Sequence, residues 1–120
     1  MTVIQLLLVS AAGGCGALLR FTIDVVFPFK TFPWATFLVN ITGSFFAGLA
    51  VGWAGQLLPI AFEPYLVTGF LGGFTTMSAV SVQTVQLVSR RRMGLAVVVG
   101  FGQVVAAVIA ATTGVLLAGL

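Results

Sequence analysis

The sequence has no histidine, and its only acidic residues are Asp24 and Glu63. Neither a nucleophile with its base nor a set of metal-binding side chains can be assembled from this inventory, so we do not expect an enzyme. The sequence also has no glycine-rich phosphate-binding motif, which excludes an ATP-driven pump. The single cysteine, Cys15, cannot form a disulfide within one chain and is expected to pack as a small side chain.

Charge is scarce along the whole chain. Charged residues make up 6% of the sequence and hydrophobic residues 60%, whereas a soluble domain carries about 25% charged residues. The composition therefore predicts an all-α membrane protein. Four apolar stretches reach or nearly reach the ~20 residues of a spanning helix, and they cover residues 2–19, 33–58, 65–88 and 93–120. We expect one four-helix transmembrane domain over residues 1–120, with the first stretch retained as a helix rather than cleaved as a signal peptide.

The few basic residues are unevenly distributed between the predicted connections. Arg20 and Lys30 lie in the connection over residues 20–32, and three arginines lie in the connection over residues 89–92. The connection over residues 59–64 and both termini have none. With four spans, the first and third connections share one side, which the positive-inside rule predicts to be cytoplasmic, with both termini outside. A short arginine loop offers no groove-binding surface, so no nucleic-acid partner is expected.

The predicted membrane segments contain no acidic or basic side chain. A proton-coupled transporter normally needs such a group, and a small multidrug exporter needs a glutamate in its first helix. The polar residues that remain are neutral. Asn40 and Ser44 share a face of the second helix, and an amide is costly in lipid unless it lines a pore or bonds to another helix. Neutral donors suit a small anion that must shed water and still leave the site.

Serine and threonine hydroxyls have a second explanation, because they can bond back to carbonyls of their own helix. We leave both roles open for Ser81, Thr112 and Thr113. The third segment also carries Gln83, and the fourth carries Gln103. We assign neither of them to a site.

The third apolar segment is interrupted by the sequence GFLGGFTTMS over residues 69–78. Paired glycines followed by two threonines and a serine favour an opened helix backbone. In hydrocarbon such a backbone is tolerated only where protein or a water-filled cavity satisfies it. We therefore predict a third helix broken mid-membrane beside an ion site. A simple glycine kink without an ion is the alternative.

Small residues recur every four positions in the second and fourth segments. A four-residue spacing places them along one face of a helix and lets two backbones approach closely. We expect close packing within the chain and also an oligomeric interface. The residues are Ser44, Gly48 and Gly52 in the second segment and Gly102, Ala106, Ala110, Gly114 and Ala118 in the fourth.

Three motifs occur in an order that resembles a known family. They are GGCGALLR over residues 13–20, VNITGSF over residues 39–45 followed by Gly48, and the interrupted segment 69–78. With this length and helix count, the chain resembles the Fluc (also called CrcB) family of small fluoride channels over essentially all its residues. The resemblance implies a passive, fluoride-specific channel of the prokaryotic plasma membrane that lowers cytoplasmic fluoride. It also implies an antiparallel, dual-topology dimer in membrane lipid, with two pores.

The resemblance further implies a structural sodium ion at the dimer centre, which is not transported. Its ligands would be the backbone carbonyls of Gly72 and Thr75, two from each subunit. The chemistry agrees, because hard cations prefer oxygen ligands and glycine lets a helix open to expose carbonyls.

The resemblance also assigns pore residues. Asn40 would line the pore as a donor, and Arg20 would attract anions near the cytoplasmic mouth. Arg20 as a snorkelling anchor at a helix end is the alternative. Thr76 and Ser78 are weaker candidates, either for the polar track or for bracing the break.

One departure from the family stands out. The family usually has phenylalanines at the positions of Met77 and Val80, and a ring edge can face an anion where a thioether or isopropyl group cannot do so equally well. Phe70 and Phe74 are expected to pack and are not replacements. Together with the strong charge bias, this suggests one half of a heterodimer with a related chain of opposite orientation. A homodimer that tolerates the change, and a non-conducting structural subunit or degenerate paralogue, are the alternatives.

Overall fold

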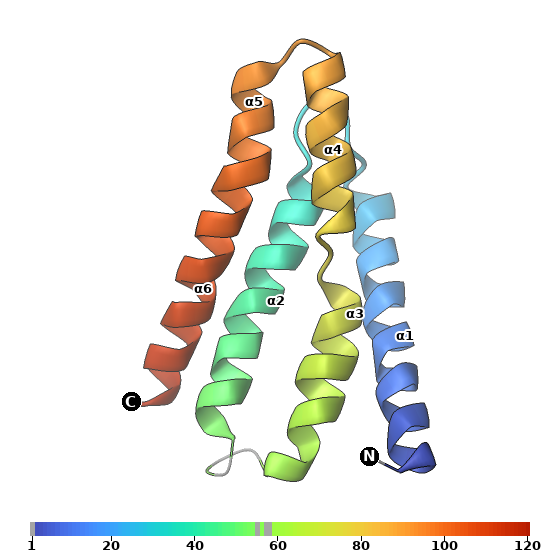
Figure 1. Ribbon diagram of the computed structural model, residues 1–120, viewed down its shortest axis with the longest axis vertical. Coiled ribbons are helices and arrows are strands. Elements are labelled where there is room, and N and C mark those ends of the chain that lie inside the picture. Colours follow the sequence, from blue (N-terminus) through green and yellow to red (C-terminus); the bar gives the residue numbers. More distant parts are fainter. Residues whose placement is uncertain (1, 55, 57–58) are drawn as a thin grey trace.

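Long helices lying side by side make up the computed structural model (Figure 1), which describes residues 2–54, 56 and 59–120. Four helical spans are long and apolar enough to cross a membrane: Val3–Val26, Trp34–Trp53, Ile60–Ser89 and Met93–Ala118. The predicted all-α architecture with four spans is therefore confirmed. The elements in order are α1 Val3–Val26, α2 Trp34–Trp53, the 3₁₀ turn η1 Ile60–Phe62, the π-helix η2 Pro64–Leu71, α3 Gly72–Phe74, α4 Ser78–Ser89, α5 Met93–Val97, the π-helix η3 Val98–Gly102 and α6 Gln103–Ala118.

Helix α1 is longer than the sequence predicted. It continues to Val26, so Arg20 and Asp24 lie in its last turns, and their placement in a connection was wrong. The chain has no helix breaker before Pro28, and a residue that precedes proline is disfavoured in the helical conformation. Charged side chains near a helix end can extend toward the polar region, so charge alone did not mark the boundary.

The connection between the second and third spans also differs from its prediction. α2 ends at Trp53, while the predicted span ran to residue 58; residues 55, 57 and 58 lie outside the described part of the chain. Most of the predicted loop over residues 59–64 is helical, because only Glu63 separates η1 from η2. Pro64 stands at the first position of η2, where its missing N–H costs no helical hydrogen bond.

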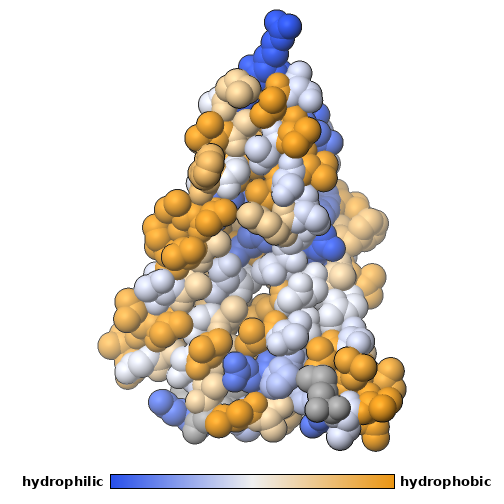
Figure 2. All heavy atoms as spheres, in the orientation of Figure 1, coloured by the Kyte–Doolittle hydropathy of each residue, from blue (hydrophilic) through white to orange (hydrophobic). Residues whose placement is uncertain are grey.

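The first and third connections meet at one end of the molecule, while both termini lie at the other (Figure 1). Arg90 joins the two connections. Its Nη1 donates to the Lys30 carbonyl at 3.0 Å, and its guanidinium lies 5.1 Å from the centre of the Phe29 ring. Figure 2 shows hydrophilic atoms at the tip of this end and orange, apolar atoms over much of the flanks. The prediction that both basic connections share one end is confirmed, and its assignment to the cytoplasm stays a prediction.

Glycines bring α2 and α6 into backbone contact. A Cβ on Gly48 would lie 2.1 Å from the Ala111 carbonyl oxygen, and one on Gly114 would lie 2.3 Å from the Phe45 carbonyl oxygen. Both approaches are too close for any side chain, so the small-residue faces pack against each other within the chain, as predicted. Their further use in an oligomeric interface stays a prediction.

The third span is held against α1 in the same way. A Cβ on Gly16 would lie 2.0 Å from the Phe70 carbonyl oxygen, and one on Gly73 would lie 2.0 Å from the Gly13 carbonyl oxygen. The glycine-rich first motif thus serves close approach of two backbones. It fixes the end of the third span's first half, directly before the segment that carries the candidate site.

Candidate functional site

The third span is not helical between α3 and α4, over residues 75–77, which we call the interruption (Figure 1). Thr75 has φ −82° and ψ 156°, an extended conformation. Its N–H and its hydroxyl still donate to the Leu71 carbonyl, at 2.9 and 3.0 Å, so the preceding turn is closed. The N–H and the carbonyl of the next residue, Thr76, are bonded outside this helix.

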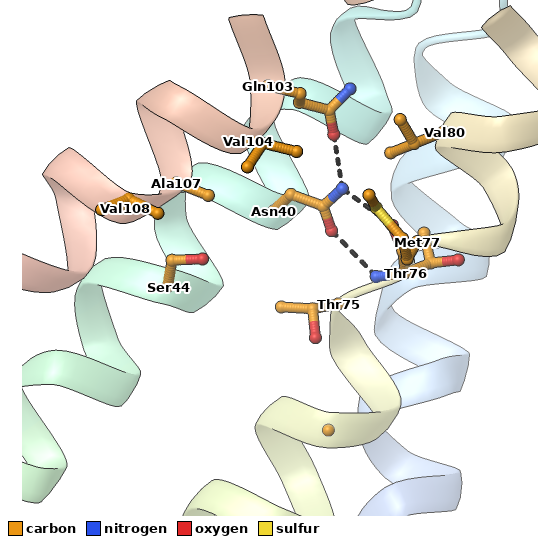
Figure 3. Close-up of a pocket in the computed structure, with 11 residues that line it drawn as sticks. Asn40, Ser44, Thr75, Thr76, Met77, Val80, Gln103, Val104, Ala107 and Val108 are labelled. Carbon is orange, nitrogen blue, oxygen red and sulfur yellow. Dashed lines mark hydrogen bonds between the residues drawn. The ribbon is translucent and has the colours of Figure 1, made fainter. Parts of the chain in front are cut away.

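Asn40 of α2 supplies the partners of both Thr76 groups. Its Oδ1 accepts from the Thr76 N–H at 2.8 Å, and its Nδ2 donates to the Thr76 carbonyl at 2.8 Å (Figure 3). The side chain is buried and only 8% of Asn40 is exposed. One amide therefore satisfies both the backbone donor and the backbone acceptor of Thr76, which is what burial of such groups demands.

Gln103, the first residue of α6, completes the arrangement. Its Oε1 accepts a hydrogen bond from Asn40 Nδ2 (Figure 3). Only 2% of Gln103 is exposed, and its buried Nε2 has no hydrogen-bond partner in the part of the chain that the structure describes. The amides thus connect the interruption to α2 and α6.

Gln103 was not predicted as a site residue, although the sequence held a signal. An amide inside an apolar span is costly alone, and the only asparagine of the chain lies in another span. These two amides were natural partners. Pairing them required knowing which faces of the second and fourth spans meet, and periodicity alone left that open.

The Thr76 hydroxyl braces the start of α4. It accepts from the Ala79 N–H at 3.2 Å and lies 3.2 Å from the Ser78 hydroxyl. A threonine oxygen that receives an N–H three residues on is the usual arrangement of a helix N-cap. Both hydroxyls therefore take part in closing the helix after the interruption. Ser81 and Thr113 bond back to carbonyls of their own helices, at 3.2 and 2.7 Å, which supports the local explanation for these two.

A cavity of about 520 Å³ lies between α2, the interruption and α6. It brings together six of the eight candidate site residues and also Ser44, while Arg20 and Ser78 are not among its lining residues. Its polar groups are neutral amides, hydroxyls and backbone. The lining residues are Asn40, Ser44, Gly72, Thr75, Thr76, Met77, Val80, Gln103, Val104, Ala107 and Val108.

The two residues at the departed aromatic positions differ in their surroundings. Met77 is 60% exposed, whereas Val80 is 2% exposed and packs in a core cluster with Leu87 and Val99. Both nevertheless border the cavity. The expectation that Phe70 and Phe74 pack is confirmed, since their rings stack 6.1 Å apart and Phe74 is buried.

Arg20 lies on α1 and is half-buried. Its Nε atom is buried and has no hydrogen-bond partner among the described residues. Arg20 is absent from the cavity lining. Within one chain it is therefore separate from the amide-lined site.

Comparison with known proteins agrees with these features. The family model described as CrcB-like protein, Camphor Resistance (CrcB), matches residues 7–115. The Fluoride-specific ion channel FluC 1 of Leifsonia xyli subsp. xyli is 40% identical over 124 residues, which span all of this chain and 90% of that protein.

Two further relatives carry similar names. The Fluoride-specific ion channel FluC of Novosphingobium aromaticivorans is 41% identical over 110 residues, covering 83% of this chain and 84% of that protein. Fluoride-specific ion channel FluC 2 of Bacillus cereus (strain ATCC 10987 / NRS 248) is 38% identical over 94 residues, covering 76% of this chain and 77% of that protein. With a matching family model over most of its length and relatives near 40% identity, this chain belongs to the CrcB family.

Proposed function

We propose that this chain is a subunit of a fluoride-specific ion channel, not an enzyme, and that it lets fluoride leave the cell passively. The observation that supports this proposal most directly is the neutral, amide-lined cavity at the interruption. It lies in a chain whose relatives are named fluoride-specific ion channels. A small anion gives up hydration water only where donors replace it, and uncharged donors do so without trapping the ion.

The roles of individual residues follow from their positions. Asn40 and Thr76 stand at the cavity and shape its polar wall. Ser78 braces the segment beside it through the Thr76 hydroxyl. Arg20, whose buried Nε has no hydrogen-bond partner in the described part of the chain, attracts anions at the mouth of the path.

A structural sodium ion at the carbonyls of Gly72 and Thr75 is part of the proposal. In a continuous helix these carbonyls would accept from the N–H groups of Thr76 and Ala79. The Thr76 N–H donates to Asn40 instead, and the Ala79 N–H donates to the Thr76 hydroxyl. Both carbonyl oxygens have thus lost their usual helical donor, which leaves them suited to a hard cation. Among the described residues no cluster of acidic, histidine or cysteine side chains competes for this role.

The assembly that we propose is an antiparallel, dual-topology dimer, with the interruption in mid-membrane. Two carbonyls from each subunit would then surround the sodium ion. The basic residues gathered at one end favour one insertion direction, which supports a related partner of opposite orientation. That partner would supply the aromatic residues that Met77 and Val80 replace. A homodimer that tolerates the two replacements is the competing assembly.

Flux from liposomes tests the function and the need for a partner together. The protein is reconstituted alone and with any related chain encoded nearby, and fluoride and chloride efflux are measured in parallel. Fluoride efflux without chloride efflux in either preparation supports the channel. The absence of fluoride flux in both preparations contradicts the channel and favours a non-conducting subunit. The lack of both family phenylalanines, at Met77 and Val80, is the reason to test that alternative.

Sodium is tested separately by thermal unfolding in detergent. If the ion bridges two subunits, replacing sodium by N-methylglucamine at constant ionic strength should lower the unfolding temperature and favour the monomer. Potassium serves as the control for a monovalent cation of different size. An unfolding temperature that is unchanged by sodium removal would contradict the sodium site and leave the channel proposal standing.

A further inference from the structure

The amides at the cavity form a chain of hydrogen bonds whose direction is fixed by the backbone. The Thr76 N–H requires an acceptor and the Thr76 carbonyl a donor, so the Asn40 side chain can sit in one orientation only. Asn40 Nδ2 then requires an acceptor from Gln103, which must present its Oε1. The nitrogen of Gln103 is left at the free end. The last group in this series of hydrogen bonds is therefore a donor. The bonding pattern fixes this orientation, although amide oxygen and nitrogen have nearly the same size and shape.

The hydrogen inventory shows which amide is uncommitted. An amide nitrogen carries two hydrogens, and Asn40 Nδ2 contacts two acceptors, the Thr76 carbonyl and Gln103 Oε1. Asn40 therefore has no hydrogen left for an ion. Gln103 Nε2 also carries two hydrogens, is buried, and has no partner among the described residues. A buried donor without an acceptor is costly, so this group is poised to donate to any anion that reaches it.

We propose that Gln103, through Nε2, is the amide that donates to the permeating fluoride ion, and that Asn40 is a positioning residue. This rests on the proposed function, because it names the donor within that same site. Figure 3 shows the Gln103 nitrogen turned away from Asn40, and Gln103 and Val80 both border the cavity. A residue with a free polar donor thus lines the same cavity as Val80, a position where the family usually has a phenylalanine.

Amide NMR of the intact protein tests the donor directly. Asn40 is the only asparagine, and the sequence has five glutamines, so selective ¹⁵N labelling of the two residue types yields few side-chain signals. The Gln103 side-chain signal is assigned as the one that is missing from the spectrum of the Gln103→His variant. Sodium fluoride, compared with sodium chloride at equal concentration, should shift the Gln103 amide protons and leave the Asn40 pair nearly unmoved. A fluoride shift at Asn40 without one at Gln103, or at neither residue, overturns the proposal.

Flux supplies the second readout. A hydrogen bond to a charged group is worth about 1.5–3 kcal/mol, so Gln103→Met should lower fluoride efflux about tenfold or more. Gln56→Met is the matched control, since Gln56 is exposed in the turn after α2 and should keep wild-type flux. Gln103→His retains an acceptor and a donor in its neutral form and should restore part of the flux at alkaline pH. Gln103→Met flux within twofold of wild type overturns the proposal.

The two proposals fail in different ways. If wild-type liposomes pass no fluoride but the Gln103 signal still shifts with fluoride alone, the channel function fails and the anion site stands. If fluoride flows while the Gln103 signal is unmoved, the channel stands and the donor assignment is wrong. Should Gln103→Met not yield a monodisperse protein, the fluoride titration of the wild-type chain decides the question by itself.

Discussion

Helices α2 and α6 meet in two regions that use different chemistry. Toward the chain termini, Gly48 and Gly114 let the two backbones touch, with no space for a side chain. Toward the basic connections, Asn40 and Gln103 meet through their amides, and a cavity opens beside them. The same pair of helices thus has backbone contact at one end and a side-chain contact with a cavity beside it at the other. Glycine packing brings the two backbones into contact, and polar side chains line the space that opens beside them.

The largest effect is expected from breaking the polar region. Asn40→Leu leaves the N–H and carbonyl of Thr76 without partners, and each unsatisfied buried group costs about 1–3 kcal/mol. The unfolding temperature in detergent should fall strongly, and fluoride flux should be lost. Ser44→Ala is the control, because Ser44 lies one turn away on the same cavity wall. Equal stability of the two variants would show that the interruption does not depend on Asn40.

The second prediction breaks the glycine region. Gly48→Ala places a methyl group 2.1 Å from the Ala111 carbonyl oxygen, so α2 and α6 must separate at a cost of about 1–3 kcal/mol. Gly14→Ala is the matched control, since a Cβ there meets nothing within 4 Å. Thermal unfolding should show a clear loss for the first and little change, or a gain, for the second. A tolerated Gly48→Ala would mean that the tight contact contributes little to the scaffold.

A smaller effect is expected at the start of α4. Thr76→Val removes the hydroxyl that accepts from the Ala79 N–H, and loss of a helix cap typically costs about 1 kcal/mol. Thr113→Val removes a hydroxyl that, among the described residues, bonds only to the Ile109 carbonyl of its own helix, so the stability of this variant should stay within about 0.5 kcal/mol of wild type. The free energies of unfolding of the two variants are measured under the same conditions and compared. Matching losses would deny Thr76 a special bracing role.

The sequence predicted the glycine region better than the polar one. A four-residue spacing of small residues is a local pattern, and it correctly indicated that Gly48 and Gly114 lie on packing faces. The partner of Asn40 depended instead on a contact across 63 positions, with Gln103. No local pattern encodes such a pair. The helix boundary at Arg20 failed for a related reason, because a charge within α1 is a sign of a membrane border but not of a helix end.

The smallest change in stability is expected at Met77. A substitution there can change ion permeation without disturbing either of the two packing regions. Met77 is 60% exposed and borders the cavity, so Met77→Phe should leave the unfolding free energy within about 0.5 kcal/mol of wild type. If a ring edge assists the anion, fluoride flux of the protein reconstituted alone should rise severalfold. Val80→Phe is the contrasting variant. Val80 is 2% exposed, so the larger phenylalanine side chain should destabilise the fold by about 1–3 kcal/mol. Unchanged flux in a stable Met77→Phe protein would show that the missing ring does not limit this subunit, and the case for an aromatic-donating partner would then rest on charge distribution alone.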